Sequence, residues 1–168
     1  MSQYNDVIRL QASFTRPSDT TTYAIGDAMT NSTSAPSVLT FSGVAPWGSH
    51  VMVIGVTIHT SSAPTLSPFF DLRLFNTTFT AVNDNSAFTL TDAEGLTGAG
   101  GISVFSVYTA TNNQQVSNHA LATPIKLRDR LDSDASTSGS LFGMLVAANA
   151  YVPTSAEVFT IGLFLDRL

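Results

Sequence analysis

The chain has 168 residues, a formal net charge of −5, no cysteine, and only 11% charged residues. The length is enough for one domain with a real core, and the lack of cysteine excludes a disulfide framework, cysteine-ligated zinc and thiol catalysis. The negative charge argues against nucleic-acid binding, which depends on neutralising phosphates, and neighbouring aspartates dilute the best basic cluster, Lys126, Arg128 and Arg130.

The first predicted element is a strand from Ile8 to Phe14, where apolar and polar residues alternate. This period of two is typical of a strand with one buried face. The strand should end before Pro17, because proline fixes φ and cannot donate a hydrogen bond to a ladder. Ser18 and Asp19 can bond their own backbone and turn the chain. We therefore expect a strand, a stiff elbow, and a second short strand from Thr20 to Tyr23.

The next predicted strands are a short one from Val38 to Phe41, closed by Gly43, and a long one from His50 to Thr60. Both faces of the long strand are largely apolar near its start. This pattern predicts a central strand that is covered on both sides, by a second sheet or by a neighbouring subunit. A regular pleat would point His50 and His59 to opposite faces, which would prevent them from sharing a metal ion.

The second half of the chain is predicted to hold five more strands. One begins at Pro68, and the others span residues 102–108, 121–127, 141–148 and 158–167. The stretch 82–101, rich in glycine towards its end, is predicted to form a loop with one helical turn around Ala93. About eight strands separated by Gly, Pro, Asn and Ser turns indicate a single all-β domain over residues 1–168. The expected architecture is an antiparallel β-sandwich of the jelly-roll-like type.

The sequence offers little for catalysis or metal binding. The G-x-S-x-G elbow of serine hydrolases is absent. Glycosidases use a pair of carboxylates, and with only two glutamates, Glu94 and Glu157, the sequence gives little support for one. The aspartates at 129–134 lack the glycine and the terminal glutamate of an EF-hand loop, and the acidic stretch at 83–94 gives the same weak signal. We therefore predict no enzyme activity, no cofactor and no metal site.

Four side chains are candidates for contact with a partner: Arg16, Asp19, Tyr23 and Trp47. The first three belong to the elbow, where they can either lock the turn or contact a partner. Trp47 lies on a predicted turn, where it either plugs the end of the sandwich or anchors a partner. The general burial of tryptophan favours the plug.

The composition indicates a protein that packs against other protein. The chain has a single lysine, so its surface must rely on Ser, Thr, Asn and Gln for solubility. Burying hydroxyl and methyl groups costs less than burying charges, which suits a surface in contact with other copies or another protein. The first residues do not resemble a signal peptide, and no apolar run approaches a membrane-spanning length. We expect a soluble protein made in a cytoplasm, with no membrane partner.

The most distinctive motif in the sequence is Phe14 to Asp27, F-T-R-P-S-D-T-T-T-Y-A-I-G-D. It resembles an "F-x-R-P-x-D-T-x-x-Y-x-x-G-D" opening that recurs in small structural proteins of tailed bacteriophages. The match covers a small part of the chain, and the remainder agrees in length, β-richness and low charge. The resemblance implies a virion component and brings no catalytic residue with it.

The hypothesis that follows is a capsid decoration or cement protein on the virion, made in the host cytoplasm. Such proteins often act as homotrimers near capsid symmetry axes, so the expected partner is the major capsid protein. The resemblance also covers tail and receptor-binding proteins, and a tail sandwich with carbohydrate affinity is the alternative. A carbohydrate-active enzyme or lectin is the alternative outside the structural class.

Overall fold

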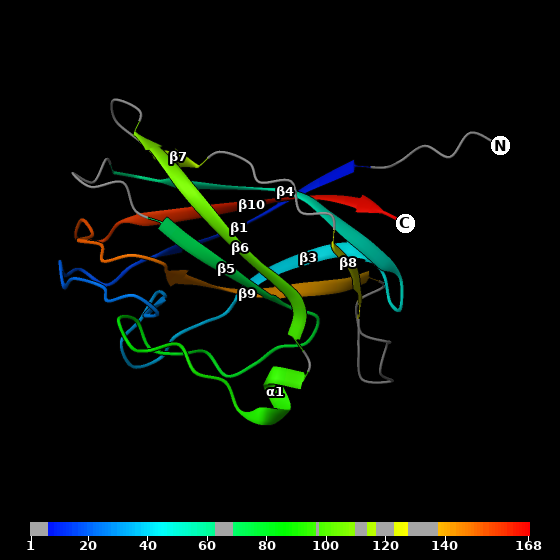
Figure 1. Cartoon of the computed structure of the whole chain (residues 1–168), viewed down its shortest axis with the longest axis horizontal. Coiled ribbons are helices and arrows are strands. Elements are labelled where there is room, and N and C mark those ends of the chain that lie inside the picture. The colour runs from blue at the N-terminus through cyan, green and yellow to red at the C-terminus, as the bar shows by residue number, and fades with distance from the viewer. Residues whose placement is uncertain (1–6, 63–68, 97, 110–113, 117–122, 128–137) are drawn as a thin grey trace.

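The computed structural model describes residues 7–62, 69–96, 98–109, 114–116, 123–127 and 138–168. Its described part is almost entirely β-structure, with one five-residue helix (Figure 1). The elements are β1 (Val7–Thr15), β2 (Ala28–Met29), β3 (Leu39–Pro46), β4 (His50–Thr60), β5 (Phe69–Phe75), α1 (Asp92–Leu96), β6 (Gly98–Thr109), β7 (Gln114–Val116), β8 (Thr123–Lys126), β9 (Ser138–Ala147) and β10 (Val158–Arg167). The helix is far too short to cross a membrane, and no other helix occurs in these ranges.

The strands form two packed antiparallel sheets. One sheet has the order β1-β10-β4-β8, and the other has the order β3-β9-β5-β6. Of the eight main strands, those that follow one another in the chain lie in opposite sheets, except for β5 and β6, which pair with each other. This is the arrangement of a jelly roll. The short β2 extends the second sheet along β9, and β7 pairs with both β4 and β6. The predicted all-β sandwich is confirmed.

The main core lies between the sheets and is centred on aromatic side chains. Phe70 of β5 meets Phe159 of β10 edge to face, with ring centroids 5.6 Å apart. Phe14 of β1 stacks on the same Phe159 at 5.3 Å. As predicted, the even-numbered residues of β1 face this core, while the odd-numbered residues are exposed.

A second apolar cluster lies on the outer face of the β3-β9-β5-β6 sheet. Phe75, Met144 and Val146 point outward from the sheet, and Phe79 and Phe88 of the following segment pack on them. The stretch 76–91 is therefore a cover for the sheet, although sequence alone marked most of it as a loop. The predicted helical turn is present as α1.

Three predicted strand boundaries were wrong. Of the stretch 20–23, only Tyr23 pairs, through a single antiparallel bridge to Tyr151. Gly43 does not end its strand, because β3 continues to Pro46. Gly43, with a φ of 73°, lies where the register of β3 with β9 shifts. Strand β6 begins at Gly98, so glycines assigned to the loop lie inside a strand. Residues 128–137 lie outside the described ranges, as do His119 and residues 121–122.

The faces of β4 were also predicted incorrectly, because the strand carries a bulge. Its pairing with β10 skips Ile54, so that the buried residues change from Val51 and Val53 to Val56 and Ile58. His50 and His59 thus both lie out of phase with the buried set. They remain roughly 30 Å apart along the strand, too far to share a metal ion. The described residues contain no cluster of three metal-ligating side chains.

Candidate functional site

The elbow that follows β1 contains a buried arginine. Arg16 is 2% exposed, and its backbone N–H continues the β1–β10 ladder by donating to the carbonyl of Glu157 at 2.9 Å. Because the ladder fixes this backbone, the guanidinium is directed into the end of the sandwich. Its Nη1 donates to the Asp19 carbonyl at 3.3 Å, which holds the turn after Pro17.

The charge of Arg16 is balanced by Asp84, 68 residues further along the chain. Arg16 Nη2 donates to Asp84 Oδ2 at 3.1 Å, and both side chains are fully buried. The Tyr23 hydroxyl donates to Asp84 Oδ1 at 2.6 Å, and the Thr30 backbone N–H donates to the same oxygen at 2.8 Å. Tyr23 in turn accepts a hydrogen bond from Arg16 Nε, and the guanidinium lies 4.7 Å from the Tyr23 ring centroid. Every partner of this ion pair is therefore hydrogen-bonded, the condition under which a buried pair is tolerated.

Asp19 is the second, partly exposed acid of the elbow. It accepts hydrogen bonds from the Thr21 backbone N–H at 3.0 Å and from Arg16 Nη2 at 3.3 Å. The Thr21 bond, with the charge of Arg16 behind it, lowers the pKa of the Asp19 carboxyl below its ordinary value. The interpretation of Arg16 and Asp19 as residues that lock the turn agrees with these contacts.

A second buried pair lies beside the first. The Tyr151 hydroxyl donates to Glu157 Oε2 at 2.5 Å, and the Thr154 backbone N–H donates to the same oxygen at 3.1 Å. The rings of Tyr151 and Tyr23 stack with centroids 6.2 Å apart. Burial, followed by the bond to a carboxylate, raises the pKa of each tyrosine above its ordinary value. We call the set Arg16, Tyr23, Asp84, Tyr151 and Glu157 the buried polar lock.

The lock ties together three segments that are far apart in sequence: residues 16–30, residue 84, and residues 151–157. Its members are almost inaccessible to solvent, so no substrate can reach them. Their arrangement is structural. Sequence reasoning found Arg16, Asp19 and Tyr23 but gave no such role to Asp84 or Glu157, because no local pattern marks a residue whose partner is distant.

The remaining sequence-derived candidates lie elsewhere. Trp47 is half-buried on the β3–β4 turn, where its Cε3 faces Gly139 of β9. Contact of Arg16, Asp19, Tyr23 and Trp47 with a partner protein stays a prediction. Of these four, Arg16 and Tyr23 have side chains that this conformation encloses.

The acidic stretch at 83–94 has a structural explanation. Glu94 accepts from the backbone N–H of Thr91 at 2.9 Å and of Thr80 at 2.6 Å, and the Glu94 N–H donates to Thr91 Oγ1 at 3.3 Å. This is a capping box at the start of α1. The Thr91 and Thr80 backbone bonds lower the pKa of Glu94 to about 2. Asp84 and Glu94 thus serve separate parts of the structure.

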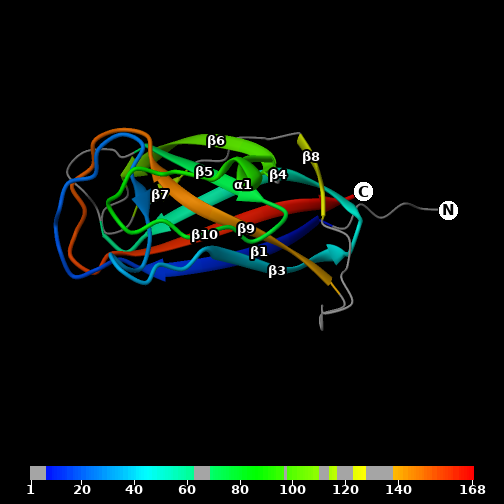
Figure 2. The ribbon, with the colours of Figure 1, turned by 90° about the horizontal axis from the view of Figure 1, so that it is seen from below.

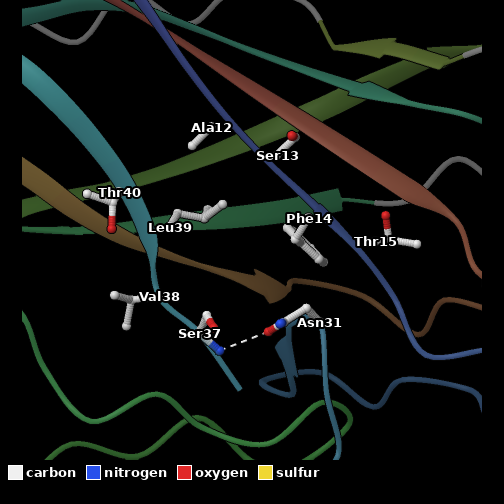
Figure 3. Close-up of a pocket in the computed structure, with 9 residues that line it drawn as sticks. All are labelled: Ala12, Ser13, Phe14, Thr15, Asn31, Ser37, Val38, Leu39 and Thr40. Carbon is white, nitrogen blue, oxygen red and sulfur yellow. Dashed lines mark hydrogen bonds between the residues drawn. The ribbon is translucent and has the colours of Figure 1, made fainter. Parts of the chain in front are cut away.

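Strands β1 and β3 run beside each other along one side of the sandwich (Figure 2). A groove lies where they face each other, and residues of both strands line it (Figure 3). Its volume is about 570 Å³. Nine residues line it, and none is charged: Ala12, Ser13, Phe14, Thr15, Asn31, Ser37, Val38, Leu39 and Thr40. Asn31 Oδ1 accepts a hydrogen bond from the Ser37 N–H at 2.8 Å, which holds the entry of β3 at the groove wall (Figure 3).

The sequence matches no protein-family model and no curated protein. Among solved structures, the chain is similar to a chain of the cyanophage Pam1 capsid, with 15% identity, a TM-score of 0.35, and coverage of 100% of this chain and 89% of that one. It is also similar to Desmodium yellow mottle tymovirus, with 18% identity, a TM-score of 0.30, and coverage of 100% and 91%. A Clostridium thermocellum endo-1,4-β-D-xylanase gives 7% identity and a TM-score of 0.29, over 94% of this chain and 26% of that one. Likenesses this weak establish neither a shared family nor a function.

Proposed function

We propose that this protein is a structural component of a tailed-bacteriophage virion, a capsid decoration or cement protein that binds the major capsid protein. One observation carries the proposal. Three of the large apolar side chains that are exposed in the described residues belong to segments that meet at the end of the sandwich that the buried polar lock holds in place. These are Ile25, Phe69 and Val152, which are 73%, 38% and 52% exposed.

Backbone contacts bring the three segments together, which supports a shared surface for these side chains. Gly26, next to Ile25, donates its N–H to the Ala147 carbonyl at 2.8 Å, and Ala148 donates to the Phe69 carbonyl at 2.9 Å. Val152 follows Tyr151, which pairs with Tyr23. Exposed apolar residues that are grouped and rigidly held mark a protein interface, whereas single ones are ordinary. We call Ile25, Phe69 and Val152 the apolar end.

The chemistry of the apolar end suits a structural partner. The nearby carboxylates of Asp19 and Asp27 already accept hydrogen bonds from backbone N–H groups of their own turns. A shell surface that buries the apolar end would therefore desolvate few free charges. Several such weak contacts, repeated around a capsid, would act together and raise the cost of separating adjacent subunits.

The resemblance of Phe14 to Asp27 to phage structural proteins supports the same class, and two of these residues, Arg16 and Tyr23, belong to the lock. Tail and receptor-binding proteins share that resemblance, so a tail sandwich is the alternative. It would require carbohydrate affinity, which glycan binding to the purified protein would reveal.

The experiment is to mix the purified protein with phage heads that lack it and to image the heads by electron microscopy. The expected result is ordered extra density on the shell surface. The double variant Ile25→Asp, Val152→Asp should lose this density, because two buried carboxylates would be unpaired at the interface. The control is Leu96→Asp, which places the same charge at an 88%-exposed apolar residue on α1 and should bind normally. Heads that remain bare with the natural protein would refute the decoration role.

A further inference from the structure

The strand β1 forms one wall of the groove and is the outer strand of its sheet. In the described residues it pairs with β10 alone, through an unbroken register from Val7↔Asp166 to Thr15↔Val158. In an antiparallel ladder, residues alternate between those whose backbone groups bond the partner and those whose groups point away. The bond from Arg16 N–H to the Glu157 carbonyl fixes the phase, because these residues are the next pair in the register.

It follows that the even-numbered residues of β1 bond to β10, and the odd-numbered residues direct their N–H and C=O groups away from it. Two of these odd residues, Ser13 and Thr15, line the groove (Figure 3). The groove therefore offers a row of backbone donors and acceptors that no described strand uses. Hydroxyl, amide and methyl groups surround this row, and no charged side chain lies among them.

The exposed edge of β1 lacks the usual protection against pairing. Natural edge strands are blunted by short length, bulges, proline or lysine. In the described chain, β2 and β7 have two and three residues, β8 has four and contains Pro124, and β3 has a register shift and ends at Pro46. In contrast, β1 has nine residues with no shift, proline or lysine. Its one charged residue, Arg9, lies over Phe164 of β10, outside the groove. A long and regular edge of this kind is a template for another strand.

We propose that the groove binds an extended, uncharged peptide segment of another protein, which adds to the free edge of β1 as an extra strand. Main-chain hydrogen bonds to Ser13 and Thr15 would give affinity, and the neutral lining would select small hydroxyl and aliphatic side chains. A charged side chain would lose its hydration there without gaining a counterion. The inference goes beyond the capsid role, since it concerns the form of the ligand and not the particle that carries it.

The test uses a capped, uncharged peptide of about four alternating valine and threonine or serine residues, short enough to lie beside the groove residues 12–15 without reaching Gln11. Hydrogen exchange and NMR titration of the full-length protein should show protection of the Ser13 and Thr15 amides by at least about tenfold at saturation. A peptide with proline at alternate positions should not bind, because it cannot supply the ladder donors.

The matched variants are Ser13→Pro and Gln11→Pro. Both residues direct their N–H away from β10, so neither change removes a ladder bond, but Gln11 lies outside the groove. The affinity for the peptide should fall at least about tenfold with Ser13→Pro and remain within about threefold with Gln11→Pro. If proline prevents folding, Ser13→Lys and Gln11→Lys repeat the comparison with a charge in place of a ring.

Two results would overturn the proposal. The first is unchanged exchange at Ser13 and Thr15 in the presence of the peptide. The second is self-association of the protein that Ser13→Pro abolishes while the peptide fails to bind, because a second copy would then be the occupant. The assay contains no phage heads, so its outcome is independent of whether the protein decorates a shell.

Discussion

Arg16 and Asp84 form a buried ion pair at the end of β1, and the surrounding groups decide what it contributes. Taking two charges out of water is costly, and an excellent set of hydrogen bonds is needed to offset that cost. Tyr23 and Thr30 supply such bonds to Asp84. The pair therefore adds less to stability than its geometry suggests, but breaking it from one side should be severe.

Two aspartates that share the same guanidinium nitrogen provide a direct comparison. Asp84→Asn should lower the free energy of unfolding by about 3–5 kcal/mol, because Arg16 would remain charged and buried without its counterion. Asp19→Asn should cost about 0–1 kcal/mol, because the Asp19 side chain is 37% exposed and water can replace it. Urea unfolding followed by circular dichroism measures both values. Equal losses would show that Asp84 is not the dominant partner.

The two buried tyrosines predict a loss of stability at alkaline pH. Their pKa values are raised in the folded protein, so above about pH 10 the unfolded chain releases protons that the folded chain retains. Below about pH 10 both states hold these protons, so the two groups leave the free energy of unfolding unchanged. Above it the unfolded state binds fewer protons, which favours unfolding. The free energy of unfolding should fall there by up to about 1.4 kcal/mol per pH unit for each tyrosine.

Urea titrations between about pH 8 and pH 11 test this slope, which starts from the ordinary tyrosine pKa. Tyr151→Phe should remove about half of the slope assigned to the pair, whatever its effect on stability at neutral pH. A free energy of unfolding that stays constant up to pH 11 would contradict the assignment.

Gly162 of β10 leaves room for side chains from both neighbouring strands, β1 and β4. Gly162 of β10 pairs with Gln11 of β1 and Thr57 of β4. A Cβ at this position would lie 2.6 Å from Thr57 Oγ1 and 3.4 Å from Arg9 Nε. Arg9 crosses this point to lie over Phe164, with its guanidinium carbon 5.5 Å from the ring centroid.

Gly162→Ala should therefore lower the free energy of unfolding by about 1–3 kcal/mol, since Thr57 and Arg9 must both move. Gly95→Ala is the control: nothing lies within 4 Å of its added Cβ, and alanine is favoured in a helix. That change should be neutral or stabilising by up to about 1 kcal/mol. Thermal unfolding of the two variants distinguishes the outcomes, and a Gly162→Ala protein as stable as the natural one would exclude the close contact.

The outer face of the β1-β10-β4-β8 sheet is the surface on which we expect the molecule to form oligomers. Met52, Ile54 and Phe164 point away from the main core and are only half-buried. A central strand with apolar side chains on both faces was predicted to be covered on each side, and the second sheet covers one. The other face is available to a neighbouring copy.

The isolated protein is expected to form a trimer that covers this face. Multi-angle light scattering should give three times the mass of one chain, and Ile54→Glu should shift it to the monomer mass because a charge would be buried between copies. Leu96→Glu is the control, since Leu96 is 88% exposed on α1 and does not belong to this sheet. A natural protein that runs as a monomer at all concentrations would contradict the trimer.

The sequence alone determined the strand content, the sandwich class and the turn after β1, because alternating polarity, proline and glycine act over a few neighbouring residues. It also identified Arg16, Asp19 and Tyr23 as belonging together. Only the tertiary structure revealed the partner of Arg16, since Asp84 is brought to it by a long covering segment. The bulge at Ile54 and the groove beside Ser13 were likewise hidden, because both arise from the pairing and packing of strands that are distant in the chain.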